Sequence, residues 1–138
     1  MKSNIDEAVW VEIPKITDPR GNLAVIEKDT IPFAIQRVYY LFDVPSDASR
    51  GGHAHKEQLE LLVPLSGSFQ VVINDGINQK SILLNKPYKG LLITKGIWRE
   101  LTDFSAGAVC LVVSSGEFDE EDYIRDYDDF LAFKKNYR

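Results

Sequence analysis

Short apolar or alternating runs recur along the chain, and residues that favour turns separate them. Runs of about four to eight such residues are typical of β-strands, and many of them in series predict an all-β sandwich or barrel. The expected strands are Val9–Ile13, Leu23–Glu27, Gln36–Phe42, Leu59–Leu65, Ser68–Asn74, Ser81–Leu84, Leu91–Thr94, Trp98–Thr102 and Val109–Ser114. Between two of them Asn74-Asp75-Gly76 predicts a hairpin turn, because these residue types tolerate positive φ.

The pattern changes near the C-terminus, where apolar residues follow helical spacing. These apolar positions are Tyr123, Ile124, Tyr127, Phe130 and Leu131. Acidic residues fill 119–122 and lysines occupy 134 and 135, the ends at which a helix dipole favours each charge. We therefore expect a C-terminal helix over about residues 119–135, packed on the outside of the barrel or on a partner subunit.

Composition bounds the class of protein. The chain has 138 residues, which predicts a single domain over 1–138 with the barrel at about 9–115. A net charge of −5 argues against non-specific binding to nucleic acid or to an anionic membrane. The lone Cys110 excludes an internal disulfide and favours a reducing compartment. Without an apolar signal segment or a run of transmembrane length, we expect a cytoplasmic protein.

The two histidines of the chain, His53 and His55, stand one residue apart. Positions i and i+2 of a β-strand project from the same face, so both imidazoles are expected to enter one cavity. Glu60 and Gly67 follow five and twelve residues after His55. This pattern resembles the first signature motif of the cupin barrels, in which two His and one Glu hold a divalent metal. The same groups are also those that a proton-transferring enzyme needs near neutral pH.

The choice between metal and acid–base chemistry depends on Arg99. A metal cupin takes a fourth ligand from a later hairpin, and Arg99 stands where that histidine would be. A guanidinium stays protonated and has no lone pair to donate. Two His and one carboxylate alone can bind iron, so both chemistries stay open, with metal disfavoured. An internal Glu60–Arg99 ion pair would settle both charges without a metal.

Other side chains are candidates for a ligand pocket. Arg37 and Tyr39 share one strand face, where an Arg can clamp a phosphate and a Tyr hydroxyl can donate to an oxyanion. A solvated Arg37 with a half-buried Tyr39 is the competing interpretation, as hydrogen-bonded structural histidines are for His53 and His55. Trp98 is expected to pack in the barrel or to stack on a sugar or base.

Four stretches carry a specific resemblance over most of the chain. They are Ile31–Tyr40, Arg50–Lys56, Trp98–Ser105 and Asp119–Asp128. With these stretches the chain resembles the dTDP-sugar 3,4-ketoisomerases, a cupin family of deoxysugar biosynthesis. The resemblance implies an RmlC-like jelly-roll barrel that acts as a homodimer without a metal or other cofactor. The implied reaction converts dTDP-4-keto-6-deoxy-D-glucose to its 3-keto isomer, a step toward lipopolysaccharide or S-layer glycans.

The resemblance also assigns roles to residues. His53 and His55 would move protons as catalytic groups, and Tyr39 would assist them. Arg37 and Arg50 would bind the sugar or the diphosphate, and the expected substrate-binding set is completed by Glu60, Arg99 and Trp98. Many members carry Gln and His where this chain has Glu60 and Arg99. The alternatives are a metal-dependent small cupin enzyme, a related nucleotide-sugar epimerase and a non-catalytic sugar-binding cupin.

Overall fold

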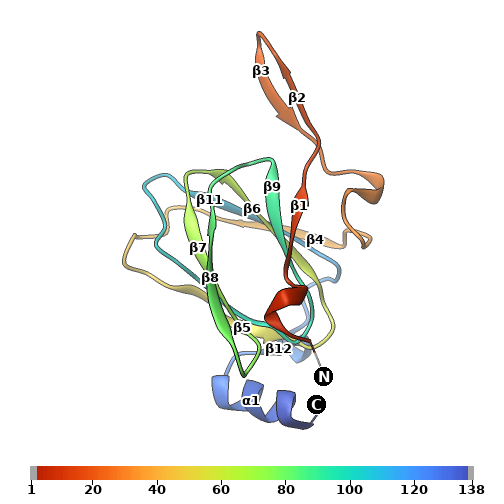
Figure 1. Cartoon of the computed structure of the whole chain (residues 1–138), viewed down its shortest axis with the longest axis vertical. Coiled ribbons are helices and arrows are strands. Elements are labelled where there is room, and N and C mark those ends of the chain that lie inside the picture. Colours follow the sequence, from red (N-terminus) through yellow and green to blue (C-terminus); the bar gives the residue numbers. More distant parts are fainter. Residues whose placement is uncertain (1–2, 137–138) are drawn as a thin grey trace.

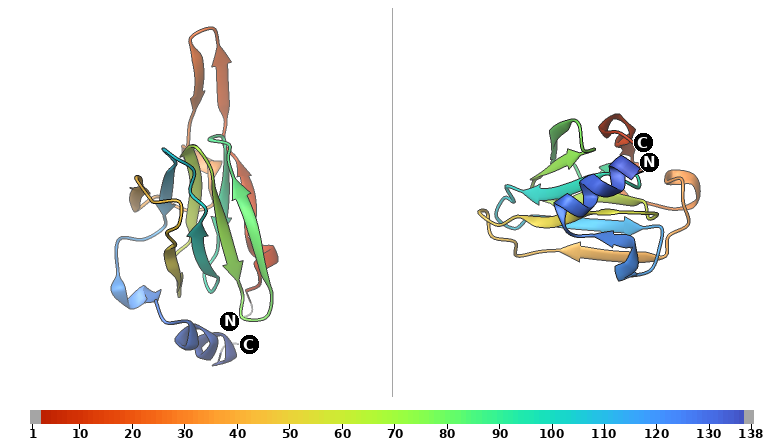
Figure 2. Two further views of the ribbon diagram at one scale, coloured as in Figure 1. Left: turned by 90° about the vertical axis from the view of Figure 1, so that its left-hand side faces the viewer. Right: turned by 90° about the horizontal axis from the view of Figure 1, so that it is seen from below.

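The computed structural model describes residues 3–136. Two five-stranded antiparallel sheets face each other, with strand orders β1-β9-β6-β11-β4 and β12-β5-β10-β7-β8 (Figures 1 and 2). The first sheet contains β1 (Val9–Glu12), β4 (Arg37–Leu41), β6 (Glu60–Ser66), β9 (Lys89–Ile93) and β11 (Val109–Ser114). The second contains β5 (Arg50–His55), β7 (Phe69–Asn74), β8 (Gln79–Leu84), β10 (Trp98–Thr102) and β12 (Tyr123–Ile124). The expected all-β jelly-roll barrel is confirmed.

The core between the sheets follows from the alternation along each strand. In β7 the side chains of Phe69, Val71 and Ile73 are fully buried, and the residues between them are partly exposed. This is the period of two that a strand with one core face requires. Phe69 stacks on Phe104 with ring centroids 5.1 Å apart, and Cys110 is buried as a free thiol. This apolar filling borders the polar cavity described below.

A second apolar cluster covers the outer face of the first sheet. Leu61 and Val63 of β6 point outward there and pack with Leu92 and Val113. The segment 26–33, which contains the 3-10 turn η2 (Lys28–Thr30), lies over this face and adds Ile31 to the cluster. The strands of this sheet are therefore apolar on both faces, which explains their near-continuous hydrophobic sequence.

An arm that the sequence did not predict projects from the barrel. It is formed by β2 (Lys15–Asp18) and β3 (Gly21–Ala24), which pair with each other and with no other strand of residues 3–136. The strand expected at Leu23–Glu27 is thus displaced toward the N-terminus. Figure 2 shows the arm extending beyond the sheets, and its apolar residues Ile16 and Leu23 are exposed.

The expected helix over 119–135 is wrong in its first part. Asp119 caps the 3-10 turn η3 (Glu120–Asp122), β12 then pairs with β5, and α1 begins only at Tyr127 and ends at Asn136. The backbone of Tyr123 and Ile124 pairs with the edge of β5, so these residues form a strand and not a helix. The apolar spacing could not reveal this, because Ile124 is buried here just as the helical spacing predicts.

The helix α1 packs beneath the second sheet (Figure 1). Phe130 contacts the ring of Trp98, with centroids 5.6 Å apart, and joins Ala54 and Ile124 in a third apolar cluster. Lys134 is buried and donates from Nζ to the carbonyl oxygen of Gly96 at 3.0 Å. No helix of residues 3–136 is long and apolar enough to cross a membrane.

Candidate active site

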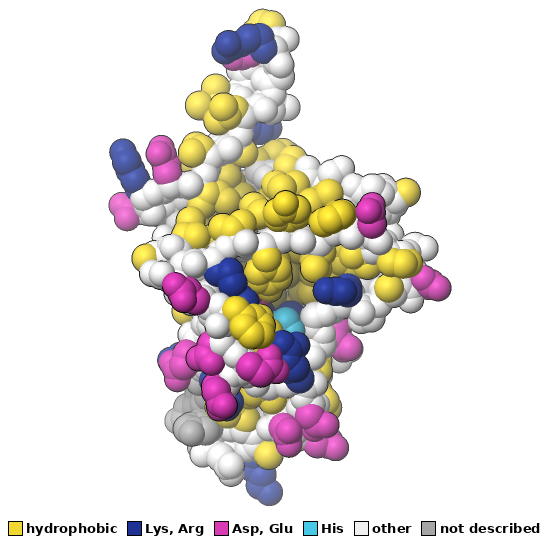
Figure 3. Space-filling view, turned by 180° about the vertical axis from the view of Figure 1, so that it is seen from behind, with side chains coloured by type: hydrophobic (Ala, Val, Ile, Leu, Met, Phe, Trp, Pro, Cys, Tyr) yellow, Lys and Arg dark blue, Asp and Glu magenta, His cyan; other side chains and the backbone are white. Residues whose placement is uncertain are grey.

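A cavity of about 430 Å³ opens into the barrel between the two sheets. Its polar and aromatic wall comes from β4, β5, β6, β10 and the segment around β12, and its apolar wall from β4, β6, β10 and β11. The polar and aromatic side chains are Tyr39, Ser49, Arg50, His53, Glu60, Arg99, Tyr123 and Arg125. In Figure 3 a histidine side chain lies at the bottom of a hollow between basic side chains. A cavity of this size and composition suits a small polar ligand.

The histidine strand is shaped by a bulge at its start. Across β5 and β10, Arg99 pairs with His53, but Leu101 pairs with Arg50, so β5 has an extra residue at Gly51-Gly52. Gly51 has φ +79°, a conformation that favours glycine. Bulges of this kind redirect neighbouring side chains beside active sites. Here the bulge brings Arg50 to the cavity along with His53.

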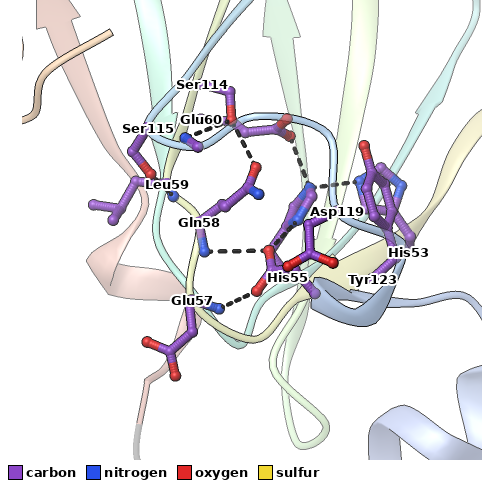
Figure 4. Close-up of polar contacts among 12 residues, drawn as sticks. His53, His55, Glu57, Gln58, Leu59, Glu60, Ser114, Ser115, Asp119 and Tyr123 are labelled. Atoms are coloured by element: carbon purple, nitrogen blue, oxygen red, sulfur yellow. Dashed lines mark hydrogen bonds and ion pairs between the residues drawn. The ribbon is translucent and has the colours of Figure 1, made fainter. Parts of the chain in front are cut away.

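His53 and His55 project from the same face of β5, as expected. Their Nε2 atoms lie 3.1 Å apart and their rings meet edge to face (Figure 4). Their exposures differ: His53 is 7% exposed and lines the cavity, whereas His55 is 0% exposed and lies behind it. The expectation that both imidazoles enter the cavity is therefore correct only for His53.

Asp122 holds the far side of His55 and was not predicted from the sequence. Its Oδ2 lies 2.8 Å from His55 Nδ1, and its Oδ1 accepts the backbone N–H of Glu57 at 2.7 Å. The carboxylate is placed by η3, immediately before β12 pairs with β5. The signal that could have found it is the acidic run before Tyr123, which the sequence analysis assigned to the first turn of a helix.

Glu60 is the centre of a second buried network. Its Oε1 accepts from Arg99 Nη1 at 2.8 Å and its Oε2 accepts from the Tyr39 hydroxyl at 2.9 Å. The ion pair that the sequence analysis raised is thus present. Burial raises the pKa of Glu60, but its hydrogen bonds and the charge of Arg99 outweigh it and bring that pKa to about 2. Glu60 is therefore ionised throughout the working pH range.

The pKa values of the two cavity-lining acid–base groups are shifted in ways that keep them neutral. Burial, followed by the charge of Arg99, lowers the pKa of His53 to about 2. Burial, followed by the charge of Glu60, raises the pKa of Tyr39 far above its usual range. His53 thus presents a lone pair and Tyr39 presents a proton at neutral pH.

The cupin motif raises the question of a divalent metal. One ligand atom each from His53, His55 and Glu60 can be chosen so that all three lie within 4.8 Å of one another. However, both Glu60 oxygens already accept hydrogen bonds, and the Arg99 guanidinium would stand directly beside a bound cation. The set also lacks the histidine that Arg99 replaces. These residues do not fit a divalent metal, and the chemistry below uses none.

Arg37 and Trp98, two of the expected substrate-binding residues, do not line the cavity. Arg37 donates from Nη2 to Gln58 Oε1 and to the Tyr123 hydroxyl, both at 3.2 Å, behind the cavity wall. Trp98 lies on the opposite face of β10 from Arg99 and packs under α1, so its assignment to substrate binding is withdrawn. The packing interpretation of Trp98 is the one that the structure supports.

Two further cavity residues come from the C-terminal segment and were missed. The ring centroid of Tyr123 lies 4.9 Å from that of His53 and 4.5 Å from that of His55. The guanidinium of Arg125 lies 4.2 Å from the centroid of the same Tyr123 ring and is held by Glu120. Both residues belong to the Asp119–Asp128 stretch, whose resemblance was noted but whose residues were assigned to a helix.

The fold and the site together define a cupin with an acid–base constellation inside its barrel. A profile of the family described as "WxcM-like, C-terminal" matches residues 6–135. The chain is 45% identical over 124 residues to the TDP-4-oxo-6-deoxy-alpha-D-glucose-3,4-oxoisomerase of Aneurinibacillus thermoaerophilus, covering 89% of each chain. The chain belongs to the WxcM-like family, and its expected kinship with the dTDP-sugar 3,4-ketoisomerases is confirmed.

Solved structures agree with this assignment. A 3,4-ketoisomerase from Helicobacter canadensis shares 45% identity and a TM-score of 0.91, over 94% of this chain and 98% of the other. The sugar 3,4-ketoisomerase QdtA of Thermoanaerobacterium thermosaccharolyticum, solved with TDP, shares 39% identity and a TM-score of 0.93, over 96% and 98%. Both matches extend over nearly the whole of each chain.

Proposed function

We propose that this protein converts dTDP-4-keto-6-deoxy-D-glucose to the 3-keto isomer by proton transfer through an enediol. The observation that carries the proposal is His53, a neutral imidazole on the wall of a cavity that Tyr39 also lines. The names of the relatives support the reaction class, and a mutant of QdtA was solved with TDP-4-keto-6-deoxyglucose. We assign the nucleotide, the sugar and the roles of the site residues to this chain on the basis of this similarity to its relatives.

The chemistry needs a base, a proton donor and a site that excludes water. His53 removes the proton at sugar carbon 3, which the neighbouring ketone makes acidic, and an enediolate forms. Tyr39 turns its hydroxyl proton from Glu60 to the oxygen at carbon 4 and accepts the proton of the oxygen at carbon 3. His53 then returns a proton to carbon 4, which completes the isomerisation without a cofactor.

The diphosphate of the substrate is assigned to the cationic edge of the cavity. Arg50 lies at the bulge of β5, and Arg125 lies across the cavity on the C-terminal segment. Arg guanidinium groups bind phosphate oxygens through charge-assisted hydrogen bonds. Arg99 is not available for this role, because Glu60 and the carbonyl oxygen of Ile97 engage it. Arg37 supports Tyr123 from behind and does not touch the ligand in this assignment.

The chain is also proposed to form a homodimer. The edge strand β4 exposes Val38, Tyr40 and the adjacent Phe42, which are 53%, 61% and 60% exposed. The arm adds Ile16 and Leu23 to the exposed apolar residues, and an isolated two-stranded arm is marginally stable in water. An apolar edge and an unsupported arm are both features that a second subunit would cover. Sedimentation should give twice the chain mass, and Tyr40→Glu with Phe42→Glu should give the monomer.

The decisive experiment for the reaction is incubation with dTDP-4-keto-6-deoxyglucose in deuterium oxide. Deuterium should enter at carbon 3 or carbon 4, and the 3-keto product should be trapped by a 3-aminotransferase. A metal-dependent cupin enzyme would lose turnover on chelation. A non-catalytic sugar-binding cupin would bind dTDP but leave both carbons unexchanged, and that result would overturn the proposed reaction. Cytoplasmic location and a role in lipopolysaccharide or S-layer glycan synthesis remain predictions.

A further inference from the structure

The Asp122 carboxylate reaches His55 from a segment more than sixty residues further along the chain. Three donors converge on it: the backbone N–H of Glu57 at 2.7 Å, the backbone N–H of Gln58 at 3.3 Å, and His55 Nδ1 at 2.8 Å. Two of these donors are backbone amides, which can only donate. The oxygens of Asp122 therefore act as acceptors, and His55 Nδ1 carries a proton.

The proton on His55 Nδ1 determines the state of its other ring nitrogen. A neutral imidazole has one N–H, so His55 Nε2 presents a lone pair. With His55 neutral the local charges are also balanced, because two carboxylates, Asp122 and Glu60, are matched by two guanidinium groups. These belong to Arg99 and Arg37, whose nitrogens lie 2.8 and 3.7 Å from Glu60. The lone pair of His55 Nε2 faces His53 Nε2 at 3.1 Å (Figure 4).

His53 must then donate from Nε2. Two N–H groups or two lone pairs cannot face each other at 3.1 Å, so the proton of neutral His53 lies on Nε2 and its Nδ1 is bare. No residue in the described range 3–136 hydrogen-bonds to His53 Nδ1, whereas His53 itself lines the cavity. A bare nitrogen on a ring that lines the cavity is the form that a base toward substrate requires.

We propose that Asp122 is a positioning residue that sets the tautomers of both histidines and drives a proton relay through His55 to His53. This inference rests on the proposed isomerase function, and neither Asp122 nor His55 touches the substrate in it. Asp122 fixes the proton on His55 Nδ1, His55 fixes the proton on His53 Nε2, and His53 Nδ1 is left as the base.

The relay balances at each step. The carbon 3–hydrogen bond breaks and leaves its electron pair in the enediolate, while His53 Nδ1 takes the proton. At the same time the Nε2 proton of His53 passes to His55 Nε2. The positive charge then rests on His55, which lies 2.8 Å from Asp122 and 3.4 Å from Glu60. When His53 Nδ1 delivers its proton to carbon 4, the Nε2 proton returns from His55 and the resting tautomers are restored.

The relay also answers a difficulty with His53 as a lone base. Burial and the charge of Arg99 lower the pKa of His53 to about 2, so an isolated imidazolium at this position would be costly. Transfer of the second proton to His55 moves the positive charge from a position beside Arg99 to one between two carboxylates. His53 thereby acts as a base while it stays neutral overall.

The test exploits the fact that the chain has only two histidines. We would label histidine with nitrogen-15 and read the tautomer of each ring by long-range proton–nitrogen correlation at pH 7.5, in the complex with dTDP and without it. The wild type should show His55 protonated on Nδ1 and His53 protonated on Nε2. The opposite tautomer at either ring in the wild type would overturn the proposal without any variant.

The informative variant is Asp122→Asn. Its amide oxygen keeps the Glu57 backbone contact, which turns the amide NH₂ toward His55 Nδ1 and forces the proton of His55 to Nε2. His53 should follow by moving its proton to Nδ1, which removes the base. Both tautomers should invert, and kcat should fall by roughly 10²–10⁴-fold, the range for loss of a positioned base, with KM nearly unchanged.

The matched control is Asp128→Asn, the same chemical change at an exposed carboxylate on α1. It should leave both tautomers and kcat unchanged. Wild-type tautomers together with near-normal kcat in Asp122→Asn would refute the relay, and so would a loss of kcat with the tautomers unchanged. The wild-type tautomers could be as stated while dTDP-4-keto-6-deoxyglucose is not turned over. That result would refute both the proposed reaction and the relay. The hydrogen bonds that link Asp122, His55 and His53 would still be confirmed.

Discussion

Arg99 Nη1 donates to Glu60 Oε1 across 2.8 Å at a point where both side chains are at most 2% exposed. This pair occupies the place where a metal cupin would hold its cation, and it cancels the charge of the Glu that the motif supplies. A buried pair gains little over well-packed apolar residues, but removal of one partner leaves an uncompensated charge. The pair is therefore a sensitive point of both stability and chemistry.

Removal of one partner of the Glu60–Arg99 pair should lower the free energy of unfolding. Glu60→Ala leaves the Arg99 guanidinium buried beside the carbonyl of Ile97 alone, and we expect a loss of about 3–5 kcal/mol in the free energy of unfolding. The double variant Glu60→Leu/Arg99→Met should recover most of that loss, because it removes both charges and keeps the volume. Urea unfolding of the three proteins measures this. Equal stability of Glu60→Ala and the wild type would show that water, and not Glu60, satisfies Arg99.

Metal content is a separate prediction from the same pair. Protein purified without added metal should carry substoichiometric transition metal, because Arg99 lies where a fourth ligand would stand. Chelation should leave the turnover of dTDP-4-keto-6-deoxyglucose unchanged. Arg99→His is the informative comparison, since it restores a ligand and removes the cation. The opposite outcome would be a wild type that carries near-stoichiometric iron, nickel or zinc and loses this metal together with its activity on chelation. That result would show that Glu60 is a metal ligand.

Replacement of His53 and replacement of His55 should affect deuterium exchange at carbon 3 differently. His53→Asn should lower kcat by roughly 10²–10⁴-fold and abolish deuterium exchange at carbon 3, because His53 faces the cavity. His55→Asn should lower kcat over the same range but keep slow exchange at carbon 3, since His53 is still present. Both should bind dTDP normally in calorimetry, because neither group is assigned to the diphosphate. Near-normal turnover in both variants would make the pair structural.

The sequence predicted the barrel and the inward histidines because alternation along a strand is a local property. It paired His53 with His55 on one face, and it raised a Glu60–Arg99 ion pair as one possibility. Local pattern could not show that His55 lies behind His53, since depth within a barrel depends on what packs in front. Trp98 illustrates the same limit: once Arg99 points inward, the neighbouring Trp98 must point outward under α1.

The C-terminal segment was predicted least well, for a physical reason. Tyr123 and Ile124 satisfy helical spacing, but the open edge of β5 offers them backbone partners, and tertiary pairing overrides the local preference. This one error hid Asp122, Tyr123 and Arg125 together. The arm formed by β2 and β3 was missed because each of its strands has only one large apolar residue.

Arg50 and Arg125 should contribute to binding more than to chemistry. Arg50→Ala and Arg125→Ala should each weaken dTDP binding by roughly 10-fold or more, the scale of one charge-assisted contact, while kcat at saturation changes little. Lys80→Ala, an exposed cation on β8, serves as the control for loss of a positive charge. Titration calorimetry with dTDP separates the three. Unchanged affinity in both Arg variants would place the diphosphate elsewhere.

The last prediction concerns stability as a function of pH. The pKa of His53 falls from 6.5 to about 2 on folding, so between these values the unfolded chain binds a proton that the folded chain does not. The contribution of His53 is therefore complete above pH 6.5 and is lost as the pH falls, by roughly 1.4 kcal/mol per pH unit. Glu60, with a pKa lowered from 4.5 to about 2, adds a loss of the same sign only below pH 4.5.

Between pH 6.5 and 5 the slope should thus report His53 rather than Glu60. Urea unfolding at half-unit steps from pH 8 to 5 should give a free energy of unfolding that is flat at first and then falls. His53→Asn should remove that part of the slope, while Asp128→Asn, which changes an exposed carboxylate, should retain it. If His53→Asn and the wild type lose stability in parallel, then His53 is charged in the folded protein and cannot serve as the base.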